Sequence, residues 1–324
     1  MNIRHRLWWG ALALALGAGA GVAQAADYPD RTLRAIVPSP AGSAPDIITR
    51  LLAERMSRAL GQSIVTENKP GGNGIIAMNE LRRAKPDGYT FGVFHAAAAV
   101  VTPMMYKAAD FDVQKDTDVV ATIAYTPMLV VANTSTPYKS LEDVVQAAQA
   151  KPDDLVFGNP VHGSVPHLTA ERIGQIRKAV FRQISFNGTS QAIQSTIGGD
   201  AQVYVDGVAP LLPLVQSGRL RALAVTADKE LPGLEGIPLA KNTVPELVST
   251  GWFVMLTPAG TPPEVTQRLH EEATKALAEP DMVERLKDLG TYPMPTSMAD
   301  AQTFISNEKQ IWRKVIDDAG VKPE

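Results

Sequence analysis

Short apolar runs alternate with amphipathic helical patterns along nearly the whole chain, and this alternation most restricts its fold. The runs at 33–37, 64–67 and 89–94 predict strands, and the patterns at 47–60 and 75–84 between them predict helices. A strand, a helix and a second strand in this order form a right-handed crossover between parallel strands, with the helix packed on the sheet. We therefore predict an α/β fold.

A second series of the same kind begins with an apolar strand at 128–132. Further strands and helices follow in alternation up to a last predicted strand at 253–256 and a long final helix at 299–319. The two series predict two lobes, each a mostly parallel sheet flanked by helices. We place lobe 1 at 26–126 plus 250–324 and lobe 2 at 127–249, with two hinge crossings near 124–128 and 248–252.

The first 25 residues have the pattern of an export signal. A basic start with Arg4 and Arg6 precedes an apolar stretch at 7–22, and Ala23-Gln24-Ala25 has the small residues of a cleavage site. The apolar stretch is shorter than the roughly 20 residues that a membrane-spanning helix needs. We therefore expect cleavage and a soluble periplasmic protein, without a lipid anchor because the chain has no Cys.

The charge balance argues against a nucleic-acid partner. The chain carries 31 basic and 34 acidic residues, for a net charge of −3, and shows no strongly basic segment. A small anion is still compatible with this balance, since local donors hold it.

Without disulfides the fold depends on an apolar core, and 45% hydrophobic residues can supply one. We expect a monomer without nucleic acid.

The loop between the first strand and the first helix has the composition of an anion-binding turn. Residues 38–46 read Pro-Ser-Pro-Ala-Gly-Ser-Ala-Pro-Asp and lead directly into the helix. Such a loop presents free backbone N–H groups and the positive end of the helix dipole. The candidate ligand-binding residues in this loop are Ser39, Ala41, Gly42, Ser43, Ala44 and Asp46. For Asp46 a capping role in the first helical turn is the alternative.

A counterpart loop precedes the helix predicted at 167–174 in the second series. Residues 159–168 contain Gly and Ser directly before the helical pattern, and the stretch 186–190 repeats this arrangement before the next helix. The candidates here are His162, Gly163, Ser164, His167 and Asn187. Because ligands of open α/β sheets bind beyond the carboxyl ends of the strands, the two loops are predicted to face each other across a cleft.

Two further polar residues follow predicted strands. His95 ends the third strand, and Asp206 follows the strand at 201–205. Each is a candidate ligand contact. A hydrogen-bonded structural role for His95 and a capping role for Asp206 stay open as alternatives.

Catalytic and cofactor motifs are weak by comparison. Ser164, His162 or His167, and Asp206 include the residue types of a hydrolytic triad, but no Gly-x-Ser-x-Gly motif surrounds the serine. The same His and Asp residues lack the spacing of a metal site. No dinucleotide or P-loop fingerprint is present. We expect neither an enzyme nor a cofactor nor a bound metal; a Ser/His hydrolase is the less favoured alternative.

Six motifs in order resemble the Bug-type (TctC-like) solute-binding proteins of tripartite tricarboxylate transporters. They cover most of the chain from 28 to 322 and lie at 37–46, 67–71, 86–90, 163–168, 218–226 and 252–262. The resemblance implies a type II, Venus-flytrap periplasmic binding protein that closes on a small carboxylate and delivers it to a membrane permease. It also implies that residues 39–46 and 161–167 bind the carboxylate through backbone amides, hydroxyls and bridging waters. A periplasmic sensor for a membrane receptor is the alternative.

Several positions depart from that family's usual pattern. An aromatic residue is usual at Ser39, Gly at Ser43 and Val161, a small polar residue at Pro45, and a Tyr-Lys-Gly-type stretch at 186–188. Pro45 removes one N–H group but is compatible with the first turn of a helix. These departures lie on the two predicted binding loops, so they bear on which ligand is selected.

Overall fold

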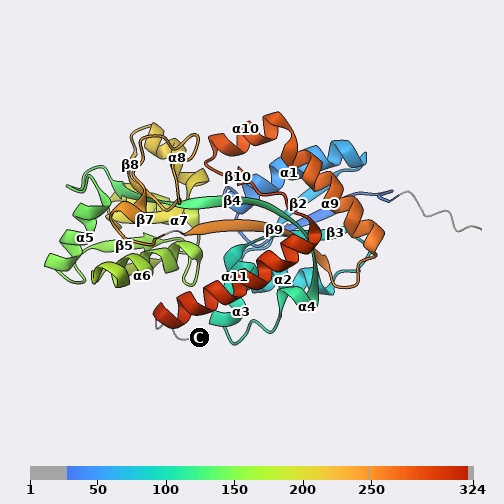
Figure 1. Cartoon of the computed structure of the whole chain (residues 1–324), viewed down its shortest axis with the longest axis horizontal. Coiled ribbons are helices and arrows are strands. Elements are labelled where there is room, and N and C mark those ends of the chain that lie inside the picture. The colour runs from blue at the N-terminus through green and yellow to red at the C-terminus, as the bar shows by residue number, and fades with distance from the viewer. Residues whose placement is uncertain (1–27, 248, 320–324) are drawn as a thin grey trace, which may run out of the picture.

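The computed structural model describes residues 28–247 and 249–319, and within them one mixed sheet runs through the whole molecule (Figure 1). Its strand order is β2-β1-β3-β9-β4-β7-β5-β6, with β8 and β10 paired to β4 at the side. The sheet has two halves with different partners. We call the half around β1, β2, β3 and β9 the first lobe and the half around β5, β6, β7 and β8 the second lobe. The predicted export signal at 1–25 lies outside the described residues.

The first lobe begins as a parallel α/β unit. Strand β1 pairs in parallel with both β2 and β3. Helix α1 begins at Ala44 and ends at Leu60, and the next residue, Gly61, closes the helix with a left-handed backbone (φ +67°). Its apolar stripe, with Ile48, Leu52 and Met56 fully buried, packs on the sheet. The elements of this part are β1 (Leu33–Val37), α1 (Ala44–Leu60), β2 (Ile64–Asn68), η1 (Gly72–Gly74), α2 (Ile75–Arg83), β3 (Thr90–His95), η2 (Ala97–Val101), α3 (Thr102–Met105) and α4 (Val113–Asp116).

The second lobe repeats this design around β5, which pairs in parallel with β6 and β7. Helix α5 begins with a capping box, in which Asp143 N–H donates to Ser140 Oγ and the Asp143 carboxylate accepts the Ser140 N–H. The elements here are α5 (Leu141–Ala150), β5 (Val156–Asn159), α6 (Val165–Arg177), β6 (Arg182–Ser185), α7 (Thr189–Gly198), β7 (Val203–Gly207), α8 (Val208–Gln216), β8 (Leu220–Val225) and η3 (Ala240–Asn242).

Two long antiparallel strands cross between the lobes. β4 (Thr117–Asn133) pairs with β9 (Thr250–Pro258) as far as Pro127, and from Met128 on it pairs with β7 and β8 instead. The predicted hinge at 124–128 therefore lies beside residues 250–252 of the other predicted hinge, with Tyr125 opposite Trp252 and Thr126 opposite Gly251. This change of partners is next to the predicted lobe boundaries at 126/127 and 249/250, which remain a prediction.

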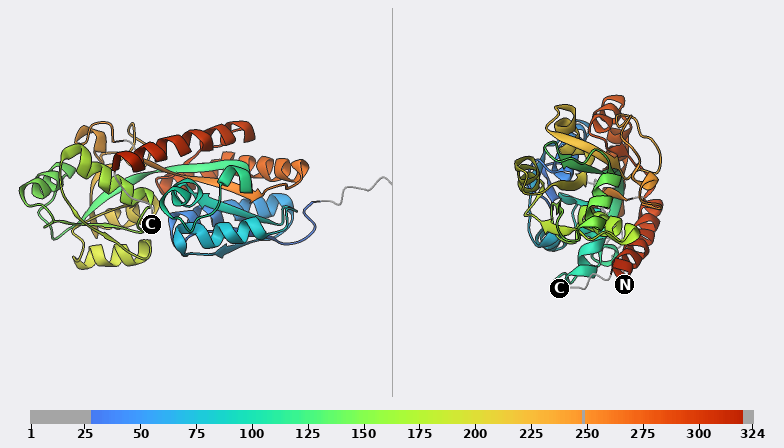
Figure 2. Two further views of the ribbon diagram at one scale, coloured as in Figure 1. Left: turned by 90° about the horizontal axis from the view of Figure 1, so that it is seen from below. Right: turned by 90° about the vertical axis from the view of Figure 1, so that its left-hand side faces the viewer.

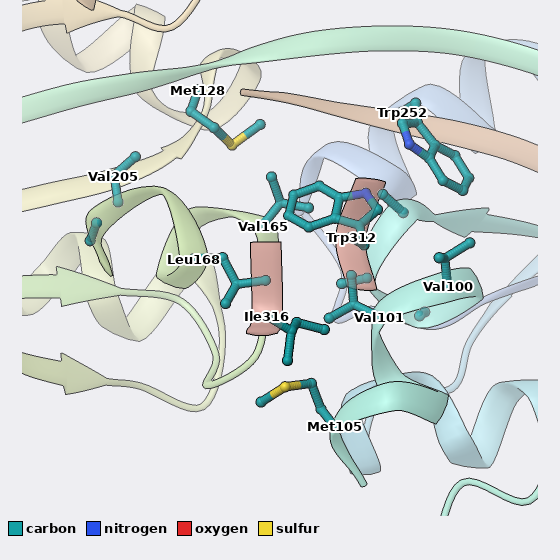
Figure 3. Close-up of a cluster of buried hydrophobic side chains, with 14 of the residues drawn as sticks. Val100, Val101, Met105, Met128, Val165, Leu168, Val205, Trp252, Trp312 and Ile316 are labelled. Atoms are coloured by element: carbon teal, nitrogen blue, oxygen red, sulfur yellow. The ribbon is translucent and has the colours of Figure 1, made fainter. Parts of the chain in front are cut away.

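The last helix joins the lobes a third time. After α9 (Pro263–Ala278), α10 (Pro280–Asp288) and β10 (Tyr292–Pro293), helix α11 (Met298–Ala319) runs along both lobes and packs against α6 as well as η2 and β4 (Figures 1 and 2). Its Trp312 and Ile316 lie between Val165 and Leu168 of the second lobe and Val101 of the first (Figure 3). The apolar core is therefore continuous from one lobe to the other.

Most predicted elements exist, with ends shifted by a few residues. The strand predicted at 128–132 was far too short, because β4 continues back to Thr117, and the short helices at 97–105 and 113–116 were not predicted. The expectation of mostly parallel sheets holds within each lobe around β1 and β5. The strands that join the lobes run antiparallel, so the complete sheet is mixed.

Candidate ligand-binding site

A cavity of about 440 Å³ lies between the two lobes and is bordered by both crossing strands. This size suits a small organic ligand. Its wall is formed by loops that follow β1, β2 and β3 in the first lobe and β5, β6 and β7 in the second. The lining residues are Pro38, Ser39, Pro40, Ser43, Ala44, Pro45, Pro70, Gly71, Gly72, Asn73, His95, Ala96, Ala97, Thr126, Met128, Pro160, Val161, Ser164, Val165, Pro166, Phe186, Asn187, Gly188, Thr189, Asp206, Gly207, Gly251 and Phe253.

The loop before α1 is held by the buried carboxylate of Asp46, which is 3% exposed. Asp46 accepts hydrogen bonds of 2.9 Å from the Gly42 N–H, from Arg50 Nε and from Asn68 Nδ2. Burial alone would raise the pKa of Asp46, but these hydrogen bonds outweigh it and the pKa lies below its usual range. The side chain thus points back into its own loop, and it is not among the lining residues.

The loop before α6 is held in the same way by His167, which is 4% exposed. The Gly163 N–H donates to His167 Nδ1 at 3.2 Å, and Nε2 lies 3.7 Å from Glu171 Oε1. Burial, and then the neighbouring ring of His162, lowers the pKa of His167 to about 4. The ring is therefore neutral at neutral pH, and like Asp46 it supports the loop without lining the cavity.

The two loops share one local design. Each has the sequence Gly-Ser-x-Pro followed by the supporting residue and Ile or Leu, at residues 42–47 and 163–168. The glycines have φ +80° and +71°, and the serine N-caps have nearly identical backbone angles. Sequence reasoning found both loops but no residue repeat between them. The repeat is present in both loops.

The two N-cap hydroxyls differ in what they offer a ligand. Ser43 Oγ donates its hydrogen to the Pro40 carbonyl at 2.7 Å. Ser164 Oγ instead accepts the His167 N–H at 3.3 Å, so its own hydrogen is available for another acceptor. Both serines line the cavity. Each helix also points its positive dipole end toward this space, which favours an anion.

His95 lines the cavity at the end of β3 and opposite Phe253 of β9. Its Nδ1 accepts the Ala98 N–H at 3.3 Å, so in the neutral ring Nε2 carries the proton and is a donor. Burial lowers the pKa of His95 to about 4. His95 therefore contributes a neutral hydrogen-bond donor at neutral pH.

Asp206 is the last residue but one of β7, lines the cavity and is 8% exposed. Its Oδ2 accepts hydrogen bonds from Tyr204 Oη at 2.6 Å and Thr189 Oγ1 at 2.8 Å, and Oδ1 accepts the Gly207 N–H at 2.8 Å. Burial raises the pKa of Asp206 above its usual range, against the effect of these hydrogen bonds.

Of the predicted site residues, the structure places seven on the cavity wall: Ser39, Ser43, Ala44, His95, Ser164, Asn187 and Asp206. It places six outside the lining set: Ala41, Gly42, Asp46, His162, Gly163 and His167. Ala41 and Gly42 are exposed at the loop tip, and the other four support or adjoin the loops. Which residues contact a ligand remains a prediction.

Two groups of lining residues were not predicted. One is the loop at 70–73, whose run of Pro and Gly after β2 is the same signal that marked the other loops. The other comes from the crossing strands and comprises Thr126, Met128, Gly251 and Phe253. No local sequence pattern marks these four, because only the crossing of β4 and β9 brings them to the cavity.

The lobes touch directly at one edge of the cavity, at the main-chain carbonyl of His162. This oxygen accepts hydrogen bonds from Asn73 Nδ2 at 3.2 Å and Tyr106 Oη at 3.1 Å, both from the first lobe. A side chain at Gly163 would meet Asn73 at 3.3 Å. The loop before α6 is therefore bonded across the lobe boundary.

The hydrolase hypothesis does not match this geometry. Ser164 Oγ is bonded to the backbone N–H of His167, whose ring accepts the Gly163 N–H instead of activating the serine. Within residues 28–247 and 249–319, no group of three or more His, Cys, Asp or Glu side chains is arranged to hold a metal ion.

Among residues 28–247 and 249–319, no helix has both the length and the apolar character needed to cross a membrane.

Two α/β lobes, two crossing strands and a cavity between helix N-termini define a two-lobed solute-binding protein. The chain belongs to the tripartite tricarboxylate transporter family of receptors, whose family model matches residues 48–321. This membership confirms the resemblance drawn from the six motifs and makes the protein a binding protein and not an enzyme.

Individual relatives can be aligned with this chain over nearly its full length. The protein BugT of Bordetella pertussis is 28% identical, and the match covers 94% of this chain and 95% of BugT. The solved structure of Rpa4515 from R. palustris with adipate is 28% identical, with a TM-score of 0.89 over 92% of this chain and all of that one. MatC from Rhodopseudomonas palustris with bound malate is 26% identical, with a TM-score of 0.83 over 89% of this chain and all of MatC.

Proposed function

We propose that the protein binds one small carboxylated solute in the interlobe cavity and delivers it, in the periplasm, to a membrane permease of the tripartite tricarboxylate type. One observation carries the proposal. The N-termini of α1 and α6, one from each lobe, line the same cavity through Ser43 and Ser164. Helix N-termini bind carboxylates through N–H groups and the helix dipole, without a cationic side chain.

The rest of the wall supports the same ligand class. His95 adds a neutral donor, while Phe186, Phe253, Met128 and Val165 offer apolar surface for a carbon skeleton. Adipate in Rpa4515 and malate in MatC are both small carboxylates, which favours this class for the present chain.

Isothermal titration of the purified mature protein with mono-, di- and tricarboxylates tests the binding. We expect at least one acid to bind and neutral sugars of similar size not to bind. Ser164→Ala should weaken the binding of that acid about five- to tenfold, because it removes a donor to a charged group. Ser43→Ala is the matched control, with a smaller effect expected since its hydrogen is already bonded to Pro40. Binding of sugars but of no acid would contradict the proposal.

Transport and export need separate measurements. N-terminal sequencing of the periplasmic fraction should find a chain that begins after residue 25. Uptake of the bound acid into vesicles that contain a tripartite permease from the same organism should depend on added binding protein. Binding without stimulated uptake would reject delivery to that permease and favour the sensory alternative.

A further inference from the structure

The cavity wall carries an acidic side chain but no basic one. Among the lining residues, all of which the structure describes, Asp206 is the only Asp or Glu, and none is Lys or Arg. The other titratable lining residue, His95, is neutral at neutral pH because burial lowers its pKa to about 4. A carboxylate ligand beside an ionised Asp206 would therefore put two negative charges in a largely apolar space, where charges are poorly screened.

Burial disfavours the ionised form of the Asp206 carboxyl group, whereas the hydrogen-bond donors around it favour that form. Three donors, the hydroxyls of Tyr204 and Thr189 and the Gly207 N–H, point at its two oxygens. A carboxylate that accepts several hydrogen bonds is stabilised as the anion. Oδ2 already accepts two hydrogen bonds, whereas Oδ1 accepts one and can accept another. The position thus suits a further donor, and a charged donor would also compensate the buried charge.

We propose that the solute carries an ammonium group that donates to Asp206 Oδ1, in addition to the carboxylate at the helix N-termini, so that the ligand class is that of amino acids and related zwitterions. This inference rests on the proposed function and specifies its ligand. Asp206 is then the residue that selects amino acids over unsubstituted acids, while Tyr204 and Thr189 hold its carboxylate in position.

Matched ligand triplets test the proposal on the wild-type protein. In each triplet one carbon bears hydrogen, hydroxyl or ammonium: succinate, malate and aspartate; phenylacetate, mandelate and phenylglycine; 3-phenylpropionate, 3-phenyllactate and phenylalanine. In the triplet that binds, we expect titration calorimetry to give at least about tenfold tighter binding for the amino acid than for either other member. An amino acid that binds no tighter than its unsubstituted partner overturns the inference but leaves carboxylate binding intact. Failure of every acid to bind overturns both proposals.

The variant Asp206→Asn examines the residue itself. It should reduce the preference for the amino acid to within about threefold, since a neutral amide no longer pairs with the ammonium. Asp46→Asn is the control, because Asp46 is a second buried acid that supports a loop without lining the cavity. It should change the affinities of all three ligands by a similar factor. An unchanged preference in a folded Asp206→Asn protein contradicts the inference, and the wild-type triplets still decide it if that variant fails to fold.

Discussion

The Gly163 N–H donates to His167 Nδ1, and the Gly42 N–H donates to Asp46 Oδ2, so an imidazole and a carboxylate have the same place in two loops 121 positions apart. In both lobes the acceptor is the third residue of a helix and the donor lies four residues before it. This hydrogen bond fixes the glycine in its left-handed conformation and orients the serine N-cap toward the cavity. The loops differ in charge, and that difference makes the second loop sensitive to acid.

Acid should destabilise the protein through His167 and His95. The pKa of each is about 4 in the folded protein and lies below the ordinary value of about 6.5 in the unfolded chain. Their contribution to stability is therefore complete above pH 6.5 and is lost as the pH falls toward 4. The loss should reach up to about 3 kcal/mol for each ring. Urea unfolding between pH 8 and pH 4 measures it.

The variant His167→Asn separates the two rings. Asn keeps a neutral acceptor for the Gly163 N–H but takes up no proton, so the acid-dependent loss should fall by about half. At pH 8 the variant should be within about 1 kcal/mol of the wild type. Equal acid-dependent losses in both proteins would show that His167 does not titrate with a pKa of about 4.

Asp46→Ala should destabilise the first lobe strongly. It removes the acceptor of three hydrogen bonds and leaves the Gly42 N–H and one N–H of the Asn68 amide without their acceptor, while Asn68 keeps its bond to the Ser39 carbonyl; the expected cost is about 2–4 kcal/mol. Asp46→Asn should cost less because its amide oxygen still accepts. Arg50→Ala is the control, and loss of that half-exposed ion pair should cost less than about 1 kcal/mol. Equal costs for Asp46→Ala and Arg50→Ala in denaturant unfolding would refute this role.

Tyr106→Phe should weaken ligand binding from outside the cavity lining. Its hydroxyl donates to the His162 carbonyl across the lobe boundary, so its loss disfavours this arrangement of the two lobes by about 1 kcal/mol, or roughly fivefold in affinity. Tyr28→Phe is the matched control, because that hydroxyl donates to the Gly88 carbonyl within the first lobe. Calorimetry with the acid that binds wild type measures both. Equal affinities in the two variants would argue against a contribution from the interlobe bond.

Glu308 should be needed for the packing of α11 on the crossing strands. One of its carboxylate oxygens accepts the indole N–H groups of both Trp252 in β9 and Trp312 in α11. Glu308→Ala would leave two buried indole donors unpaired and should cost about 2–4 kcal/mol. Glu308→Gln keeps an acceptor oxygen and should stay within about 1 kcal/mol of wild type. Urea unfolding followed by tryptophan fluorescence compares them, and a Gln variant as unstable as Ala would contradict this account.

The sequence alone determined the local framework. Strand β1 and the end of α1 at Gly61 follow from apolar periodicity and a left-handed glycine, both of which act within a few residues. Ser43 and Ser164 were recognisable because a Gly-Ser turn before a helical pattern is a local signal. Family membership followed from the order of six such signals.

Only the tertiary structure decided which side chains reach the cavity. Asp46 and His167 turn back to a glycine N–H, whereas Asp206 and His95 stand on strand ends that face the space between the lobes. Thr126 and Gly251 join them because β4 and β9 run antiparallel across the lobe boundary. Side-chain direction at a helix start depends on competing hydrogen bonds, and the cavity depends on contacts between residues more than a hundred positions apart. Neither quantity is encoded in local periodicity.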